Sequence, residues 1–169
     1  MDAAALRAMQ APIKERLKSD PKSGLITLKA KGSTDGDGIA CKIETGRAIA
    51  VAGLHPATGG SGLELCSGDM LLEALVACAG VTLKSVATAI EVPLRQGLVF
   101  VEGDIDFRGT LGVDKEAPVG FSEIRLRFAV DTDAPQDKLD LLLKLTERYC
   151  VVYQTIKNGP KISVCMQRI

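Results

Sequence analysis

The sequence predicts an α+β protein in which two long central helices pack on a mostly antiparallel sheet. Several segments alternate apolar and polar residues, as half-buried strands do, and two longer segments repeat apolar residues at helical spacing. In chain order the expected elements are α-β-β-β-α-β-β-α-β, which is the pattern of an α+β domain rather than of repeated βαβ units. No repeat or low-complexity stretch interrupts this order, so we expect a single domain over residues 1–169, with residues 1–21 as a helical extension.

The N-terminal third predicts one helix and three strands. The amphipathic segment Ala3–Leu17 is the helix, and a Ser-Asp-Pro sequence stops it. The strands are Gly24–Lys31, Gly38–Glu44 and Arg47–Gly53. Turn-forming sequences rich in Asp, Gly, Ser and Thr separate them, so we expect two successive hairpins, followed by a Gly-rich loop over His55–Ser67.

The first long helix is expected over Met70–Ile90, with Ser67 as a candidate N-cap. This run carries only Glu73 and Lys84 as charged residues. The two lie 11 positions apart, hence within about 20° of each other around a helix, and Glu91 continues the same stripe. One narrow polar stripe is typical of a helix at the centre of its own protein, so we expect no membrane span.

The C-terminal half predicts two strands, a helix and a last strand. Leu98–Arg108 and Phe121–Asp131 alternate apolar and charged residues. The second long helix opens after Asp133-Ala134-Pro135 and closes at Asn158-Gly159-Pro160. Lys161–Arg168 is the expected final strand.

The composition excludes several function classes. The 21 basic residues balance the 21 acidic ones, which argues against nucleic acid as a partner. Aromatic residues make up 4% and Trp is absent, so stacking platforms for bases or sugars are not expected. There is a single His and no CxxC pair, so we expect no metal site, and no sequence motif predicts a cofactor. The odd number of scattered cysteines and the lack of a signal peptide predict a reducing compartment, the cytoplasm.

The two long helices each carry one cysteine on a predicted buried face. The first face comprises Leu71, Leu75, Cys78, Thr82 and Val86, and the second comprises Leu139, Leu143, Thr146, Cys150 and Tyr153. If the two faces pack together, the sulfurs of Cys78 and Cys150 approach each other. The spacing leaves two interpretations open, a redox pair or inert core cysteines.

The sequence around these two cysteines resembles the OsmC-like family, which includes the organic hydroperoxide resistance proteins. The run Cys66–Gly80 is similar to the central helix of that family, which ends in Ala-Ala-Cys. The run Arg148–Ile156 is similar to its second cysteine segment, although Val151 replaces the proline that follows the cysteine. The Gly59-Gly60 loop and the order of strands also fit, so the resemblance covers residues 24–168.

The resemblance implies an OsmC-like fold, an intertwined homodimer and a thiol peroxidase. Cys78 would attack an organic hydroperoxide and become a sulfenic acid. Cys150 would resolve the sulfenic acid to a disulfide, and a dithiol reductant would restore both thiols. The alternative is a non-catalytic stress or hydrophobic-ligand-binding homodimer with the same fold.

Three further residues are candidates for support of the nucleophile. In the hydroperoxide resistance branch an Arg and a helix-start Glu assist the cysteine. Gly68 stands where that Glu would fall, so Asp69 is the candidate stand-in, and Arg47 is the candidate arginine. Cys66 is an extra thiol at the helix start, where backbone amides favour an anion. It is either a secondary oxidation site or a substitute anion for the missing Glu, or else a loop thiol without a role.

Overall fold

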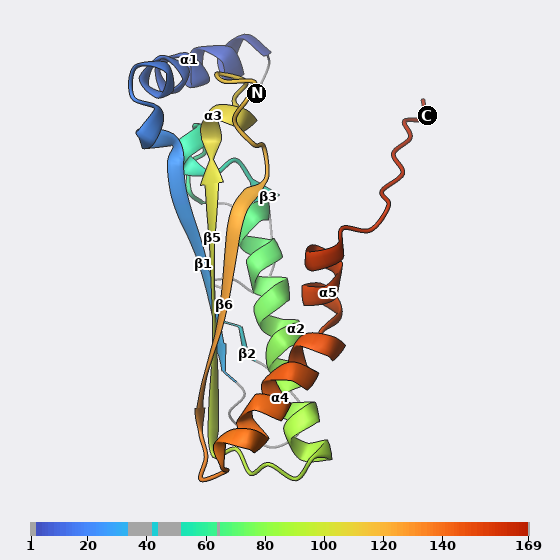
Figure 1. Ribbon diagram of the computed structural model, residues 1–169. Helices are drawn as coiled ribbons and strands as arrows, with labels where there is room; N and C mark the ends of the chain where they lie inside the picture. Colours follow the sequence, from blue (N-terminus) through green and yellow to red (C-terminus); the bar gives the residue numbers. More distant parts are fainter. Residues whose placement is uncertain (1–2, 34–41, 44–51, 64, 169) are drawn as a thin grey trace.

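The computed structural model describes residues 3–33, 42–43, 52–63 and 65–168 (Figure 1). The helices are α1 (Ala3–Ser19), α2 (Ser67–Ala89), α3 (Phe107–Thr110), α4 (Gln136–Tyr149) and α5 (Val151–Asn158), with 3-10 turns η1 (Pro21–Gly24) and η2 (Pro56–Thr58). The strands are β1 (Leu25–Ser33), β2 (Lys42–Ile43), β3 (Ala52–Gly53), β4 (Leu65–Cys66), β5 (Gln96–Asp106) and β6 (Phe121–Asp131).

The main sheet is antiparallel throughout its described part. Its strand order is β2-β1-β5-β6, so β6 forms one edge. Along β5 the side chains alternate, and Val99, Val101 and Ile105 face the core. Figure 1 shows α2 packed along one side of this sheet, with α4 and α5 beside α2. The predicted α+β class and mostly antiparallel sheet are confirmed.

Helix α2 forms the centre of the core. Its buried residues include Leu72, Val76, Ala79 and Leu83, and it contacts β1, β5, α4 and α5. The buried face of α2 is rotated relative to the face predicted from the sequence. Leu71, the first residue of the predicted face, is exposed, and Cys78 lies at the border of the buried face. By length and composition alone α2 could cross a membrane, but interior helices of soluble proteins meet the same criterion.

The second long helix is not continuous, contrary to the sequence prediction. It ends at Tyr149, and α5 begins at Val151 after the extended backbone of Cys150 (φ −72°, ψ 105°). The Cys150 amide still donates to the Thr146 carbonyl, and the Cys150 carbonyl accepts from Gln154 of α5. The two β-branched residues after Cys150 favour helix less than other apolar residues, which is consistent with a break here.

Two strand predictions need correction. The expected last strand, Lys161–Arg168, is exposed and pairs with no described strand (Figure 1). Part of the predicted loop is also a strand, since β4 pairs in parallel with β3, the described end of Arg47–Gly53. Most of Gly38–Glu44 and Arg47–Gly53 lies outside the described residues. A strand pattern specifies which residues can be buried, but not which edge they pair with.

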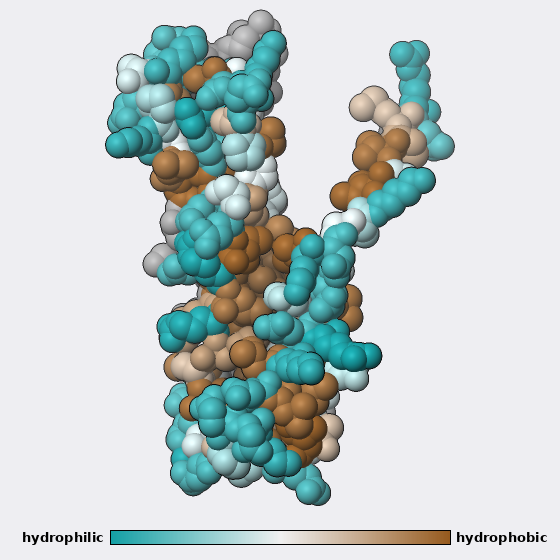
Figure 2. All heavy atoms as spheres, in the orientation of Figure 1, coloured by the Kyte–Doolittle hydropathy of each residue, from teal (hydrophilic) through white to brown (hydrophobic). Residues whose placement is uncertain are grey.

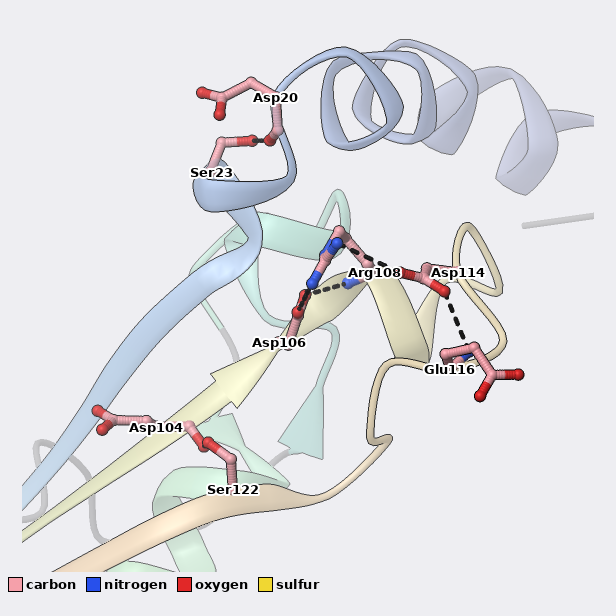
Figure 3. Close-up of polar contacts among 8 residues, drawn as sticks. All are labelled: Asp20, Ser23, Asp104, Asp106, Arg108, Asp114, Glu116 and Ser122. Carbon is pink, nitrogen blue, oxygen red and sulfur yellow. Dashed lines mark hydrogen bonds and ion pairs between the residues drawn. The ribbon is translucent and has the colours of Figure 1, made fainter.

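The outer end of β5 is held by an ion pair next to α1 and η1. Asp106 is 3% exposed, and both of its carboxylate oxygens accept hydrogen bonds from Arg108, which also contacts Asp114 (Figure 3). The Asp106 carboxylate also accepts from the Arg108 backbone amide at 3.0 Å. The Arg108 hydrogen bonds lower the pKa of Asp106, against the opposing effect of burial.

We predict that this ion pair makes stability depend on acid pH. Because the folded pKa of Asp106 is lowered, its contribution is present above the unfolded value of about 3.9 and is lost as pH falls toward the folded value. Asp106→Asn should lower the free energy of unfolding by about 2 kcal/mol at pH 7 and flatten the loss of stability below pH 4. Thermal unfolding between pH 2.5 and 7 measures both effects, with the exposed Asp20→Asn as the control. Parallel acid profiles for the wild type and Asp106→Asn would contradict the prediction.

Candidate functional site

The fold brings the two predicted cysteines together. Cys78 lies on α2, and Cys150 lies at the junction of α4 and α5. Their thiols interact electrostatically, and the Val152 amide, two residues after Cys150, donates to Cys78 Sγ, although 72 positions separate the two cysteines in the sequence. Both thiols are free. Helices α4 and α5 both contact α2, and this packing produces the juxtaposition.

The two thiols differ in exposure. Cys150 is 1% exposed and belongs to the main buried cluster of the core. Cys78 is half-buried and packs against that cluster from its border. An external molecule therefore has a more open path to Cys78 than to Cys150.

A backbone amide at the start of α5 contacts one of the two sulfurs. The Val152 amide donates to Cys78 Sγ at 3.5 Å. The first amides of a helix have no partner within the helix, and the helix dipole is positive at this end. The break at Cys150 thus places a backbone donor directly at Cys78 Sγ.

The Cys150 thiol remains protonated at neutral pH. Burial raises its pKa to about 11, and the neighbouring Cys78 adds to this rise. Hydrogen bonds from the Tyr153 and Val152 amides oppose the effect without outweighing it. The more exposed Cys78 is therefore the better placed of the two to act first as a nucleophile.

Of the three supporting candidates, Cys66 and Asp69 lie at the start of α2, away from Cys78, and the third lies outside the described residues. Cys66 is half-buried and is itself the N-cap of α2 in place of Ser67, with no side-chain capping bond. Asp69 interacts electrostatically with His55, and burial raises its pKa. Arg47 lies outside the described residues.

His55, for which sequence patterns indicate no role, has a structural one. Its Nδ1 accepts a hydrogen bond from the Ala57 amide at 3.0 Å and thereby caps η2. Its ring stacks on Phe107 with 4.8 Å between ring centroids. Gly60 completes this loop, because a Cβ atom there would lie 1.6 Å from the Leu54 carbonyl oxygen.

An open apolar groove of about 430 Å³ lies beside the thiols, between β6 and the helices. Its lining includes Leu75, one turn before Cys78, and Tyr153, one turn after Cys150. Lys157 and Glu147 add charged groups to the lining. Figure 2 shows apolar residues gathered on this face of the molecule. Among the described residues, no cluster of three or more His, Cys, Asp or Glu side chains is placed to hold a metal ion.

Sequence patterns located both cysteines but missed the amides of α5. A backbone amide can donate from almost any residue type, so the sequence does not mark it. The one available signal was the pair of β-branched residues after Cys150, Val151 and Val152, which favours a helix break there. The raised pKa of Cys150 likewise follows from burial at the junction of three helices, which spacing alone does not reveal.

Comparisons with known proteins support the resemblance seen in the sequence. A crystal structure of an OsmC-like hydroperoxide resistance protein from Jannaschia sp. CCS1 has a TM-score of 0.63 and 11% sequence identity, covering 86% of this chain and 95% of that chain. At this identity the likeness concerns the fold. A search of curated protein sequences gave no significant match. The family model of OsmC-like proteins matches residues 60–164, which include α2, α4 and α5 with both cysteines. Because this match spans more than half of the sequence, the chain belongs to the OsmC-like protein family.

Proposed function

We propose that this chain is a thiol-dependent peroxidase that reduces organic hydroperoxides through Cys78 and Cys150. The observation that carries the proposal is the thiol pair at the start of α5, where the Val152 amide donates to Cys78 Sγ. The family and the likeness to a hydroperoxide resistance protein support it.

The first step is oxidation of Cys78. Its thiolate attacks the distal oxygen of the hydroperoxide, the O–O bond breaks, and the alkoxide takes up a proton and leaves as an alcohol. Cys78 is then a sulfenic acid. The Val152 amide, which donates to Cys78 Sγ at 3.5 Å, holds the sulfur in place for the attack.

The second step is resolution by Cys150. The Cys150 sulfur attacks the Cys78 sulfur, the S–S bond forms, the S–O bond breaks, and water leaves with the proton that Cys150 gives up. The raised pKa of Cys150 keeps it a thiol until the sulfenic acid has formed nearby. An external dithiol then reduces the disulfide and is itself oxidised to a disulfide.

We also propose that the chain is a homodimer. The C-terminal segment 160–168 projects from the body of the molecule, with Ile162, Val164 and Met166 exposed to 80%, 91% and 98% (Figure 1). Val151 and Leu143 add exposed apolar surface on the helical layer. A second copy would cover this surface, which is larger than one small domain hides by itself.

The groove beside the thiols supports a second candidate function, the binding of an apolar ligand without catalysis. Its lining by Leu75, Phe121 and Tyr153 fits an aliphatic or aromatic molecule. Under this alternative, wild-type protein would bind apolar molecules but would not consume peroxide, and its thiols would stay reduced.

The roles of the two cysteines predict different variant phenotypes. Cys78→Ser should abolish consumption of an organic hydroperoxide, because the attacking sulfur is lost. Cys150→Ser should permit one turnover and leave a sulfenic acid on Cys78, since resolution comes after the first oxidation. Peroxide assays and dimedone trapping followed by mass spectrometry measure these outcomes, with exposed Cys165→Ser as the control. Full turnover by Cys78→Ser would refute the assignment of the nucleophile.

Stoichiometric oxidation should link Cys78 to Cys150 and leave Cys66 unlinked. Cys66 precedes Cys78 by 12 positions at the start of an uninterrupted α2, a separation of about 18 Å along the helix, whereas disulfides need Cα atoms within about 7 Å. Peptide mapping after one equivalent of tert-butyl hydroperoxide gives the pairing. A Cys66–Cys78 peptide would show that the first turns of α2 unwind.

The C-terminal segment predicts how the dimer can be disrupted. Ile162→Asp combined with Val164→Asp should shift the protein toward monomer, because both side chains would lie in the interface. Ser163→Asp, which adds an acidic group to the same segment at a polar position, is the control. Light scattering coupled to size-exclusion chromatography measures the mass. A wild-type protein that is monomeric at micromolar concentration would contradict the dimer itself.

A further inference from the structure

Thr146 is a buried polar residue whose hydroxyl has no hydrogen-bond partner. Thr146 is 1% exposed. Among the buried side-chain nitrogen and oxygen atoms of the described residues, its Oγ1 is the one without a hydrogen-bond partner. Threonine in a helix commonly donates to a carbonyl in the preceding turn, as Thr88 does to the Lys84 carbonyl. An unpaired buried hydroxyl lowers stability, so its presence calls for an explanation.

Thr146 lies one helical turn from the thiol pair along α4. Its carbonyl accepts the Cys150 amide at 3.0 Å, so Thr146 lies one helical turn before Cys150 on α4. One turn before Thr146, Leu142 of α4 shares a buried cluster with Leu83 of α2. One turn after Thr146, Cys150 interacts with Cys78, which is also on α2. Thr146 therefore lies in the α2–α4 contact, between the Leu83 and Cys78 levels of α2.

Apolar side chains pack around the thiol pair on its buried side. The cluster that contains Cys150 also includes Leu75, Val76 and Ala79 of α2. An oxygen atom transferred to Cys78 needs hydrogen-bond donors here, because a polar group buried without one is strongly disfavoured. A hydroxyl can donate to such an oxygen and can also accept from a thiol.

We propose that Thr146 is a positioning residue whose hydroxyl donates a hydrogen bond to the oxygen atom that Cys78 takes from the peroxide. The same bond holds this oxygen as it leaves as water when Cys150 attacks. This inference rests on the proposed peroxidase function, and it explains why the hydroxyl is unpaired in the reduced protein, where no such oxygen is bound.

The test separates the hydroxyl of Thr146 from its shape. Thr146→Val keeps the volume and removes the hydroxyl, whereas Thr146→Ser keeps the hydroxyl. Thr58→Val is the matched control, because Thr58 is also buried but donates its hydroxyl to the His55 carbonyl, at the loop before α2. Because the sequence has no Trp, the reaction cannot be followed by tryptophan fluorescence. Each protein is therefore mixed with tert-butyl hydroperoxide, quenched by alkylation at set times and analysed by mass spectrometry for thiol, sulfenic acid and disulfide.

The expected result is a separation of activity from stability. Thr146→Val should form the Cys78–Cys150 disulfide about tenfold more slowly, as expected for the loss of one hydrogen bond, while Thr146→Ser stays within about twofold of wild type. The melting temperature of Thr146→Val should equal or exceed that of wild type, because the substitution removes no native hydrogen bond. Thr58→Val should melt lower and react at the wild-type rate.

Three results would overturn the inference. They are a wild-type rate for Thr146→Val, an equal loss of rate in Thr146→Ser, and a lowered melting temperature for Thr146→Val, which would assign the hydroxyl a structural partner. Wild-type protein whose thiols do not react with the peroxide would instead refute the proposed function. The two failures are thus distinguishable in the same experiment.

Discussion

The burial of α2 between the sheet and the α4–α5 pair is the constraint on which the rest of the structure depends. Leu72, Val76 and Leu83 are almost fully removed from water, which supplies the dominant favourable contribution to folding. The small residues Ala79 and Gly80 in the same stripe are also buried and take up little space there. Because the main sheet, α4 and α5 all contact α2, its position fixes where Cys78 lies relative to these elements.

The break between α4 and α5 turns this packing arrangement into a candidate reactive site. A continuous helix would use its amides for internal hydrogen bonds, whereas the interruption at Cys150 frees the Val152 amide, which donates to Cys78 Sγ. The same junction buries Cys150 and keeps it protonated, while Cys78 remains half-exposed. Two chemically identical side chains thus acquire different properties from their surroundings, as required when one thiol acts first and the other follows.

The apolar groove and the C-terminal segment are two exposed apolar features that α5 joins in the chain. The groove is lined by β6, α2, α4 and α5, and its lining includes residues one turn from Cys78 and from Cys150. The exposed Ile162, Val164 and Met166 lie in the segment after α5, which projects from the body of the molecule. A single copy therefore exposes apolar surface in both places, in the groove next to the thiols and on the projecting segment.

The sequence by itself determined the types and order of most elements and singled out Cys78 and Cys150 as a candidate pair. It did so because apolar periodicity reports which face of a helix or strand is buried. It did not predict the break at Cys150, the orientation of the α2 stripe or the unpaired state of segment 161–168, since these depend on which surfaces meet. Only the tertiary structure showed that Cys78 contacts the start of α5 while Asp69 interacts with His55. Contacts between residues distant in sequence arise from packing, and neither helical nor strand periodicity carries information about the partner.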